Sequence, residues 1–126
     1  MRVLLLFLGF TYWVRDRYVV PILTYHHIGD HSNKSRDLNT VSAASFERQI
    51  RWISRWGYHV ISFTDLVEGI NKGHAFARNT VVIQFDDGYE DNYTYAYPVL
   101  KKFAVPATVF LVSDHISWGR INKNHL

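Results

Sequence analysis

The sequence contains no cysteine, which excludes a disulfide scaffold, thiolate metal ligands and a cysteine nucleophile. It also lacks a cluster of basic residues, because its 14 Lys and Arg are scattered along the chain with 11 Asp and Glu, and the formal net charge is only +3. Proteins that bind nucleic acid usually carry a concentrated basic patch. We therefore expect no nucleic-acid partner.

The N-terminal segment, residues 1–18, lacks the length of a membrane-spanning helix. About a dozen largely apolar residues follow Arg2 and end at the charged residues 15–17, whereas a helix needs about 20 residues to cross a bilayer core. The length and the positive start match the apolar core of an export signal, but no small-residue cleavage site follows. We interpret the segment as signal-like or as a short anchor that contacts a membrane. The alternative is a buried strand or the remnant of a longer anchor.

Residues 19–126 are expected to form one α/β unit. Hydrophobic residues make up 48% of the 126-residue chain and charged residues 20%, which excludes a disordered chain. Apolar, β-branched runs alternate with segments of helical periodicity, and this order predicts parallel strands joined by right-handed crossover helices. The predicted strands are residues 19–25, 59–61, 80–85 and 107–112. Residues 26–39 and 113–126 are expected to be loops.

Three helices are predicted from their end signals. Ser42 or Ser45 can cap a helix that ends at Gly57. Ser62 followed by an acidic residue three positions later is a capping box for a short helix through Ile70. Pro98 is placed near the first turn of the third helix, in which residues 99, 100 and 103 supply the buried face.

The best candidate for chemistry is the motif FDDGY at residues 85–89. It follows the most apolar predicted strand, and ligands bind at the carboxyl edge of parallel sheets. Adjacent carboxylates on an extended backbone point in different directions, so that one can hold a divalent cation while the other accepts a proton. The plainer alternative is a solvated Asp-Gly turn between a strand and a helix.

The segments around this motif resemble a known family. They are PILTYH at 21–26, a helix ending in WGY at 56–58, VIQFDDGY at 82–89 and LKKFAVPATVF at 100–110. In this order they resemble the N-terminal part of polysaccharide deacetylases, the NodB-homology or carbohydrate-esterase-4 family. The resemblance implies a partial (β/α) barrel, not closed within this chain. It also implies a hydrolase that removes acetyl groups from a polysaccharide with a divalent metal, commonly zinc.

The resemblance also implies roles for individual residues. Asp86 matches the family's catalytic base and Asp87 its metal-binding aspartate, so that Asp86 would take a proton from water on the metal. Tyr89 is expected to reach the substrate groove, where its backbone could help to bind an oxyanion, and His26 is expected near the mouth of the site. Gln84 stands where the family more often has threonine.

The family's second motif, His-Ser/Thr-x-x-His, does not occur before Leu126. That motif supplies two metal ligands, and a zinc site needs about three from the protein. We therefore interpret residues 19–126 as the N-terminal portion of a deacetylase domain with an incomplete metal site. His27 and His31 have the same spacing as the missing pair, but they lie in a predicted loop before the Asp pair, and solvated loop histidines are the default interpretation.

The expected substrate is a polymer of acetylated amino sugars in the cell envelope or outside the cell. A catalytically inactive remnant that binds carbohydrate is the alternative function. A third hypothesis is a magnesium-dependent, phosphate-handling α/β domain. It is disfavoured because haloacid-dehalogenase-type phosphatases place their acids as Asp-x-Asp, whereas Asp86 and Asp87 are adjacent.

Overall fold

The computed structural model describes residues 20–29, 39–113, 116–117 and 120–121. The predicted N-terminal segment, residues 1–18, and His31 lie outside these described residues. Within the described ranges, no helix is both long enough and apolar enough to cross a membrane.

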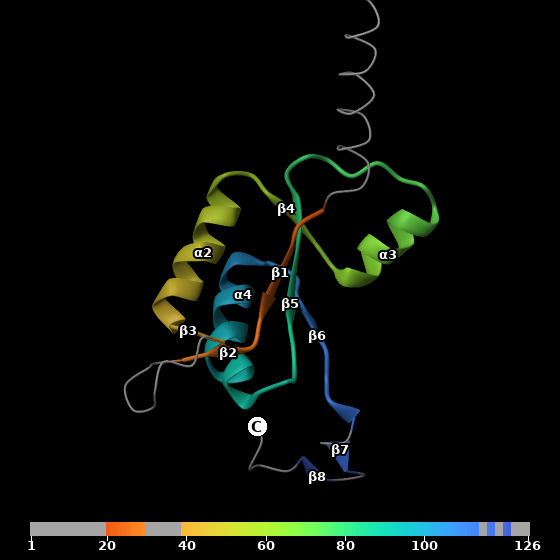
Figure 1. Cartoon of the computed structure of the whole chain (residues 1–126). Coiled ribbons are helices and arrows are strands. Elements are labelled where there is room, and N and C mark those ends of the chain that lie inside the picture. Colours follow the sequence, from red (N-terminus) through yellow and green to blue (C-terminus); the bar gives the residue numbers. More distant parts are fainter. Residues whose placement is uncertain (1–19, 30–38, 114–115, 118–119, 122–126) are drawn as a thin grey trace, which may run out of the picture.

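A parallel sheet around strand β5 (Thr80–Phe85) forms the centre of the fold (Figure 1). Strand β1 (Ile22–Tyr25) pairs with Val82 to Phe85 on one side. On the other side, β4 (His59–Ile61) pairs with the first half of β5, and β6 (Thr108–Val109) pairs with its last two residues. All three pairings are parallel, as predicted, and in the order β1-β5-β4 the connection from β1 to β4 passes the position that β5 fills, whereas β4 to β5 and β5 to β6 join direct neighbours.

The core lies between this sheet and two helices. Helix α2 (Ala43–Arg55) places Phe46 and Ile50 against Tyr25, Ile83 and Phe85, and all five are buried. The three aromatic rings pack together, with the Phe46 ring edge-on to Tyr25 at 5.0 Å between centroids. Burial raises the pKa of the Tyr25 hydroxyl, which donates to Gln49 Oε1 over 2.8 Å.

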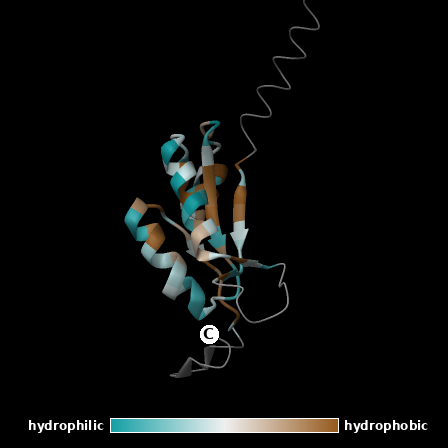
Figure 2. Cartoon of the chain, turned by 90° about the vertical axis from the view of Figure 1, so that its left-hand side faces the viewer, coloured by the Kyte–Doolittle hydropathy of each residue, from teal (hydrophilic) through white to brown (hydrophobic). Residues whose placement is uncertain are grey.

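Figure 1 shows α2 and α4 (Tyr97–Phe103) on one side of the strands and α3 (Phe63–Asn71) on the other. In Figure 2 the strands are mostly hydrophobic, whereas the helices alternate hydrophilic and hydrophobic stretches. This pattern is expected where strands are covered and helices bury one stripe of side chains. Among the described residues, β1 pairs with β5 alone, so the sheet is a part of a barrel and does not close.

The predicted helix ends are confirmed in detail for two helices. The Ser42 side chain caps α2 by accepting from the Ser45 amide, and Gly57 follows that helix at φ +70°. This left-handed conformation favours glycine. Ser62 and Asp65 form the complete capping box of α3, and these hydrogen bonds to Ser62 lower the pKa of the Asp65 carboxyl.

Pro98 lies in the first turn of α4 as predicted, and residues 99, 100 and 103 pack against the core, but the helical backbone does not begin there. The chain is already helical before Pro98, because a π-helical segment, η1 (Asn92–Ala96), leads directly into α4. Proline has no N–H to donate to the carbonyl of Thr94, four residues earlier. The preceding turn is wider, and the Tyr97 N–H donates to the Asn92 carbonyl five residues earlier.

Three other predictions were wrong in extent. The strand predicted at 107–112 is only Thr108–Val109, because its partner β5 ends at Phe85, whose carbonyl accepts the last bond from the Phe110 N–H over 2.8 Å. The predicted loop at 26–39 contains strand β2 (His27–Ile28), which pairs in parallel with β3 (Thr40–Val41). Beyond Ser113, β7 (Ile116–Ser117) and β8 (Arg120–Ile121) form an antiparallel pair where only a loop was expected.

Candidate active site

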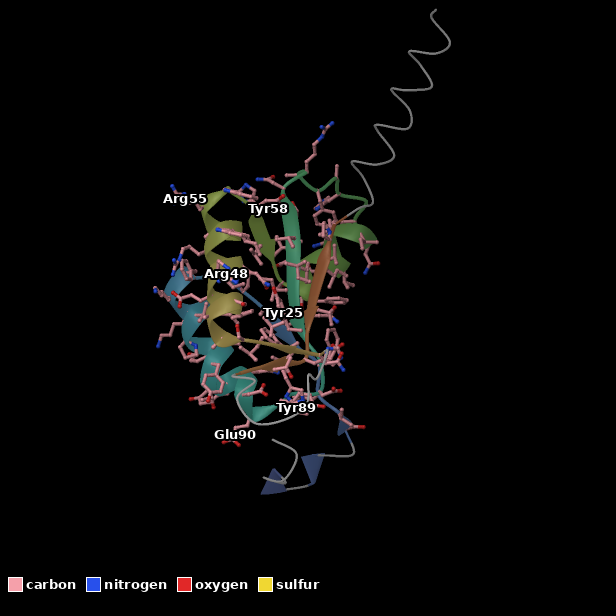
Figure 3. The ribbon with its side chains drawn as sticks, turned by 60° about the vertical axis from the view of Figure 1, so that its left-hand side comes forward. Tyr25, Arg48, Arg55, Tyr58, Tyr89 and Glu90 are labelled. Carbon is pink, nitrogen blue, oxygen red and sulfur yellow. The ribbon has the colours of Figure 1, made fainter. Side chains whose placement is uncertain are left out.

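The ends of β1 and β5 bring two predicted site residues to the same edge of the sheet. Tyr25 and Phe85 are register partners, so the residues that follow them, His26 and Asp86, leave the sheet together. The Asp86 N–H donates to the Tyr25 carbonyl over 2.9 Å and extends the pairing by one bond. Figure 3 shows Tyr89 at this edge and Tyr58 near the opposite end of the strands.

Asp86 is half-buried and lies between two polar side chains. Its Oδ1 accepts a hydrogen bond from Gln84 Nε2 at 3.2 Å, and its Oδ2 lies 4.0 Å from His26 Nε2. About a third of each of the His26 and Asp86 side chains remains exposed, 36% and 33% respectively. The carboxylate is thus oriented by neighbours and still open to a water molecule, which is what a general base needs.

Asp87 has an unusual backbone conformation. It is one of two described non-glycine residues with positive φ, at 69°, and Gly88 follows at φ 70°. A non-glycine residue held in such a region costs about 1–3 kcal/mol, and such residues cluster at functional sites. Two successive residues with positive φ turn the backbone sharply directly after Asp86.

Glycine is needed at position 88 for a steric reason as well as for its positive φ. A Cβ built at this position would overlap the Leu111 side chain, and Val109 Cγ1 would lie 3.9 Å away. The turn after β5 therefore packs closely against the end of β6. This contact joins the loops that follow two neighbouring strands.

Tyr89 lies beside His27 at the same edge. The two rings stack with centroids 3.6 Å apart and an angle of 29° between their planes. His27 Nδ1 also lies 2.7 Å from Asp91 Oδ2. One face of the Tyr89 ring is therefore covered by His27, so only its other face or its hydroxyl could contact a sugar.

A cavity of about 650 Å³ adjoins the turn on the side of α4 and β6. Among the described residues, those that line it are mostly apolar or aromatic, and they include Gly88 and Tyr89 but neither Asp86 nor Asp87. The two carboxylates therefore lie at the sheet edge beside this cavity, and the cavity itself is not the place where they would act.

The described residues do not by themselves fit a zinc ion. Within 20–29, 39–113, 116–117 and 120–121, no three His, Cys, Asp or Glu side chains lie close enough together to hold one metal. A protein zinc site needs three or four ligands. Asp87 can supply one, whereas His27, which has the spacing of a metal-binding pair with His31, is engaged with Asp91.

Two further residues complete the local structure and were not singled out in the sequence. Asp91 bonds to His27 and also accepts from the Ile28 N–H at 3.3 Å. Asn92 is 7% exposed, and in the amide orientation that satisfies its neighbours it donates to the His26 carbonyl over 2.9 Å. Their position just after the FDDGY motif was the available signal, but their partners lie more than 60 residues away in sequence.

Comparison with known proteins decides the family. A family model described as polysaccharide deacetylase matches residues 73–123. YxkH of Bacillus subtilis, whose name places it among the polysaccharide deacetylases, is 36% identical over 107 residues, which are 85% of this chain and 35% of YxkH. The chain belongs to the polysaccharide deacetylase family.

Other deacetylases agree in sequence and in fold. The poly-beta-1,6-N-acetyl-D-glucosamine N-deacetylase of Staphylococcus aureus is 35% identical over 75% of this chain and 32% of its own length. The solved structure of the Streptococcus pyogenes deacetylase PplD, in complex with acetate, superposes with a TM-score of 0.67 at 29% identity, covering 76% of this chain and 43% of that one. The chain spans about a third of the length of these curated deacetylases.

Proposed function

We propose that this chain carries part of the active site of a metal-dependent polysaccharide deacetylase, a hydrolase that removes acetyl groups from an amino-sugar polymer. The observation that carries the proposal is the pair of adjacent carboxylates at the carboxyl edge of β5, with Asp87 at φ 69°. Membership of the deacetylase family supports it.

Asp86 is the proposed catalytic base. It accepts a proton from a water molecule as the water oxygen attacks the acetyl carbonyl carbon. The carbon–nitrogen bond then breaks, and acetate and a free amine leave. The leaving nitrogen takes up the proton that Asp86 removed, and the second proton of the water is released as acetic acid ionises to acetate, so the reaction consumes only water. The Gln84 hydrogen bond and the nearby His26 hold the Asp86 carboxylate in place.

Asp87 is the proposed protein ligand of a divalent metal, zinc by the family resemblance. Since the described residues do not complete a metal site, we assign Asp87 one coordination position. Tyr89 and His26 are the proposed substrate contacts. The His27 stack on Tyr89 limits this contact to the remaining face or the hydroxyl of Tyr89.

The proposed substrate is a polymer of N-acetylated amino sugars, at the cell envelope or outside the cell. The name of the Staphylococcus aureus relative, a poly-beta-1,6-N-acetyl-D-glucosamine N-deacetylase, supports this substrate class. The apolar character of residues 1–18 is compatible with this location.

The test combines zinc titration with acetate release from an N-acetylated chitooligosaccharide. In a full-length version of the domain, which would supply the remaining metal ligands, we expect zinc to bind in calorimetry and acetate to appear. There, Asp87→Ala should abolish zinc binding, and Asp86→Asn should keep zinc binding while it reduces turnover at least about a hundredfold. Treatment with a chelator should stop acetate release. Activity that survives both substitutions would refute these roles. Binding of the oligosaccharide with no acetate released would instead support the non-catalytic carbohydrate-binding alternative.

A further inference from the structure

The carboxylate of Asp91 joins two segments that lie 64 positions apart in the sequence. Its Oδ2 lies 2.7 Å from His27 Nδ1, and its Oδ1 accepts from the Ile28 N–H at 3.3 Å. The Asp91 and His27 side chains are only 25% and 29% exposed. We call this arrangement of Asp91 with His27 and Ile28 the Asp91 clasp.

Other contacts strengthen the same junction. The His27 ring stacks on Tyr89, and the Asn92 amide, in its satisfied orientation, donates to the His26 carbonyl over 2.9 Å and to Asp91 Oδ1 over 3.0 Å. Ile28 is completely buried and belongs to the core. The clasp therefore connects the start of the helix that follows the Asp87-Gly88 turn to Ile28, which is fixed in the core.

The turn that carries the two aspartates is fixed at both of its ends by these bonds. At its beginning, the Asp86 N–H donates to the Tyr25 carbonyl over 2.9 Å. At its end, Asp91 binds His27 and Ile28. Between these points, Asp87 and Gly88 both have positive φ. A strained backbone of this kind persists only when its surroundings hold it in place.

We propose that Asp91 is a positioning residue of the deacetylation site, which acts through His27 and Ile28 to hold Asp86 and Asp87 in the geometry that the reaction needs. This inference rests on the proposed function. Asp91 touches neither substrate nor metal in this assignment. Charge-assisted hydrogen bonds to a carboxylate are about twice as strong as neutral ones and have defined directions, which suits such a role.

Two pairs of variants separate positioning from general stability. Asp91→Asn removes the charge of the clasp, and Glu47→Gln is its control, because Glu47 also pairs with two cations, Arg51 and Lys102, from helices α2 and α4. His27→Leu removes the donor to Asp91. His27→Asn is the conservative counterpart, since its amide nitrogen can replace Nδ1 as a donor.

The first readout is amide hydrogen exchange by NMR on the whole chain. Asp91→Asn and His27→Leu should speed exchange at least about tenfold at Asp86 and Asn92, whose amides donate on either side of the turn. The Val82 amide in the middle of β5 should exchange as in the unmodified protein. Glu47→Gln should leave the exchange rates of all three amides unchanged. In His27→Asn these rates should stay within about threefold of those in the unmodified protein. Equal acceleration at all three amides, or none at Asp86 and Asn92, would overturn the proposal.

The second readout is acetate release from an N-acetylated chitooligosaccharide. Asp91→Asn and His27→Leu should reduce kcat about ten- to a hundredfold with little change in KM, and His27→Asn should recover most of the loss. An equal loss in Glu47→Gln would overturn the positioning role. If the unmodified chain releases no acetate, the proposed function fails for this chain, and the exchange experiment then decides whether the clasp holds the turn.

Discussion

The side-chain amide of Gln84 donates a hydrogen bond to the carboxylate of Asp86 over 3.2 Å. The two residues are two positions apart, at the end of β5 and in the turn that follows it, so this bond links the sheet directly to the proposed base. Threonine is the more usual residue at position 84 in the family that the sequence resembles. The structure shows that the longer glutamine side chain still reaches the Asp86 carboxylate.

The first prediction concerns this bond. Gln84→Leu keeps the size of the side chain but removes the donor, and we expect acetate release to fall about tenfold, the value of one hydrogen bond to a charged group. Gln84→Glu should lower it further, because two carboxylates would then repel each other. Steady-state kinetics on an N-acetylated chitooligosaccharide gives the measurement. Full activity in Gln84→Leu would show that the bond does not orient Asp86.

The second prediction concerns the strained turn. Asp87→Gly should remove the cost of a left-handed non-glycine residue, so the free energy of unfolding should stay the same or rise by about 1 kcal/mol. Acetate release should nevertheless be lost, because the proposed metal ligand is gone. Urea unfolding and the acetate assay together make the comparison. A marked loss of stability in Asp87→Gly would mean that the carboxylate has a structural role.

The third prediction separates two demands on glycine. Gly57 and Gly88 both have φ +70°, but a Cβ at Gly57 meets nothing within 4 Å, whereas a Cβ at Gly88 overlaps the Leu111 side chain. Gly57→Ala should lower the free energy of unfolding by about 1–2 kcal/mol, because alanine is unfavourable in the left-handed conformation. Gly88→Ala should lower the free energy of unfolding by more than Gly57→Ala does. The double variant Gly88→Ala with Leu111→Ala should remove this extra loss. Equal losses for the two single variants in urea unfolding would disprove the close contact.

The fourth prediction concerns the core. Phe46 is fully buried against Tyr25 and Phe85, so Phe46→Ala should lower the free energy of unfolding by about 3–5 kcal/mol. Ile70 on α3 is 58% exposed, and Ile70→Ala serves as a surface control with an expected change of about 0.5 kcal/mol. Similar losses for both variants would be inconsistent with a core centred between α2 and β5.

The fifth prediction concerns pH and the cap of α3. Hydrogen bonds from Ser62 lower the pKa of the exposed Asp65 carboxyl in the folded protein. The charged form therefore stabilises the fold at pH values above the ordinary carboxyl pKa, and this contribution disappears as the pH falls through the lowered pKa of Asp65. Thermal unfolding of the unmodified protein and Asp65→Asn should differ at pH 7, and this difference should shrink as the pH falls below the ordinary carboxyl pKa.

Because Lys102 and Arg51 lower the pKa of Glu47 in the same direction, only the difference between the two proteins at each pH reports on Asp65. Ser62→Ala should lower the free energy of unfolding by about 1 kcal/mol at pH 7, a typical value for the loss of an N-cap side chain. A difference between the unmodified protein and Asp65→Asn that stays constant with pH would show that the charge of Asp65 does not contribute to the cap.

Local sequence signals determined several elements of this protein by themselves. The bounds of β5, the Ser42 and Ser62 caps and the glycine after α2 all follow from interactions within a few residues. The parallel pairing also followed from the order of strands and helices. The position of Asp86 and Asp87 directly after the most apolar strand was sufficient to predict that they lie at the carboxyl edge of the sheet.

Only the tertiary structure decided what surrounds those aspartates. The short extent of β6 depends on where its partner β5 ends, and the π-helical turn before Pro98 depends on a missing backbone donor within a helix that starts earlier than expected. Asp91 meets His27 because β1 and β5 end side by side, which brings residues 64 positions apart within 2.7 Å. Local sequence patterns cannot predict such contacts, because the contacts form only when strands that are distant in sequence pair in register.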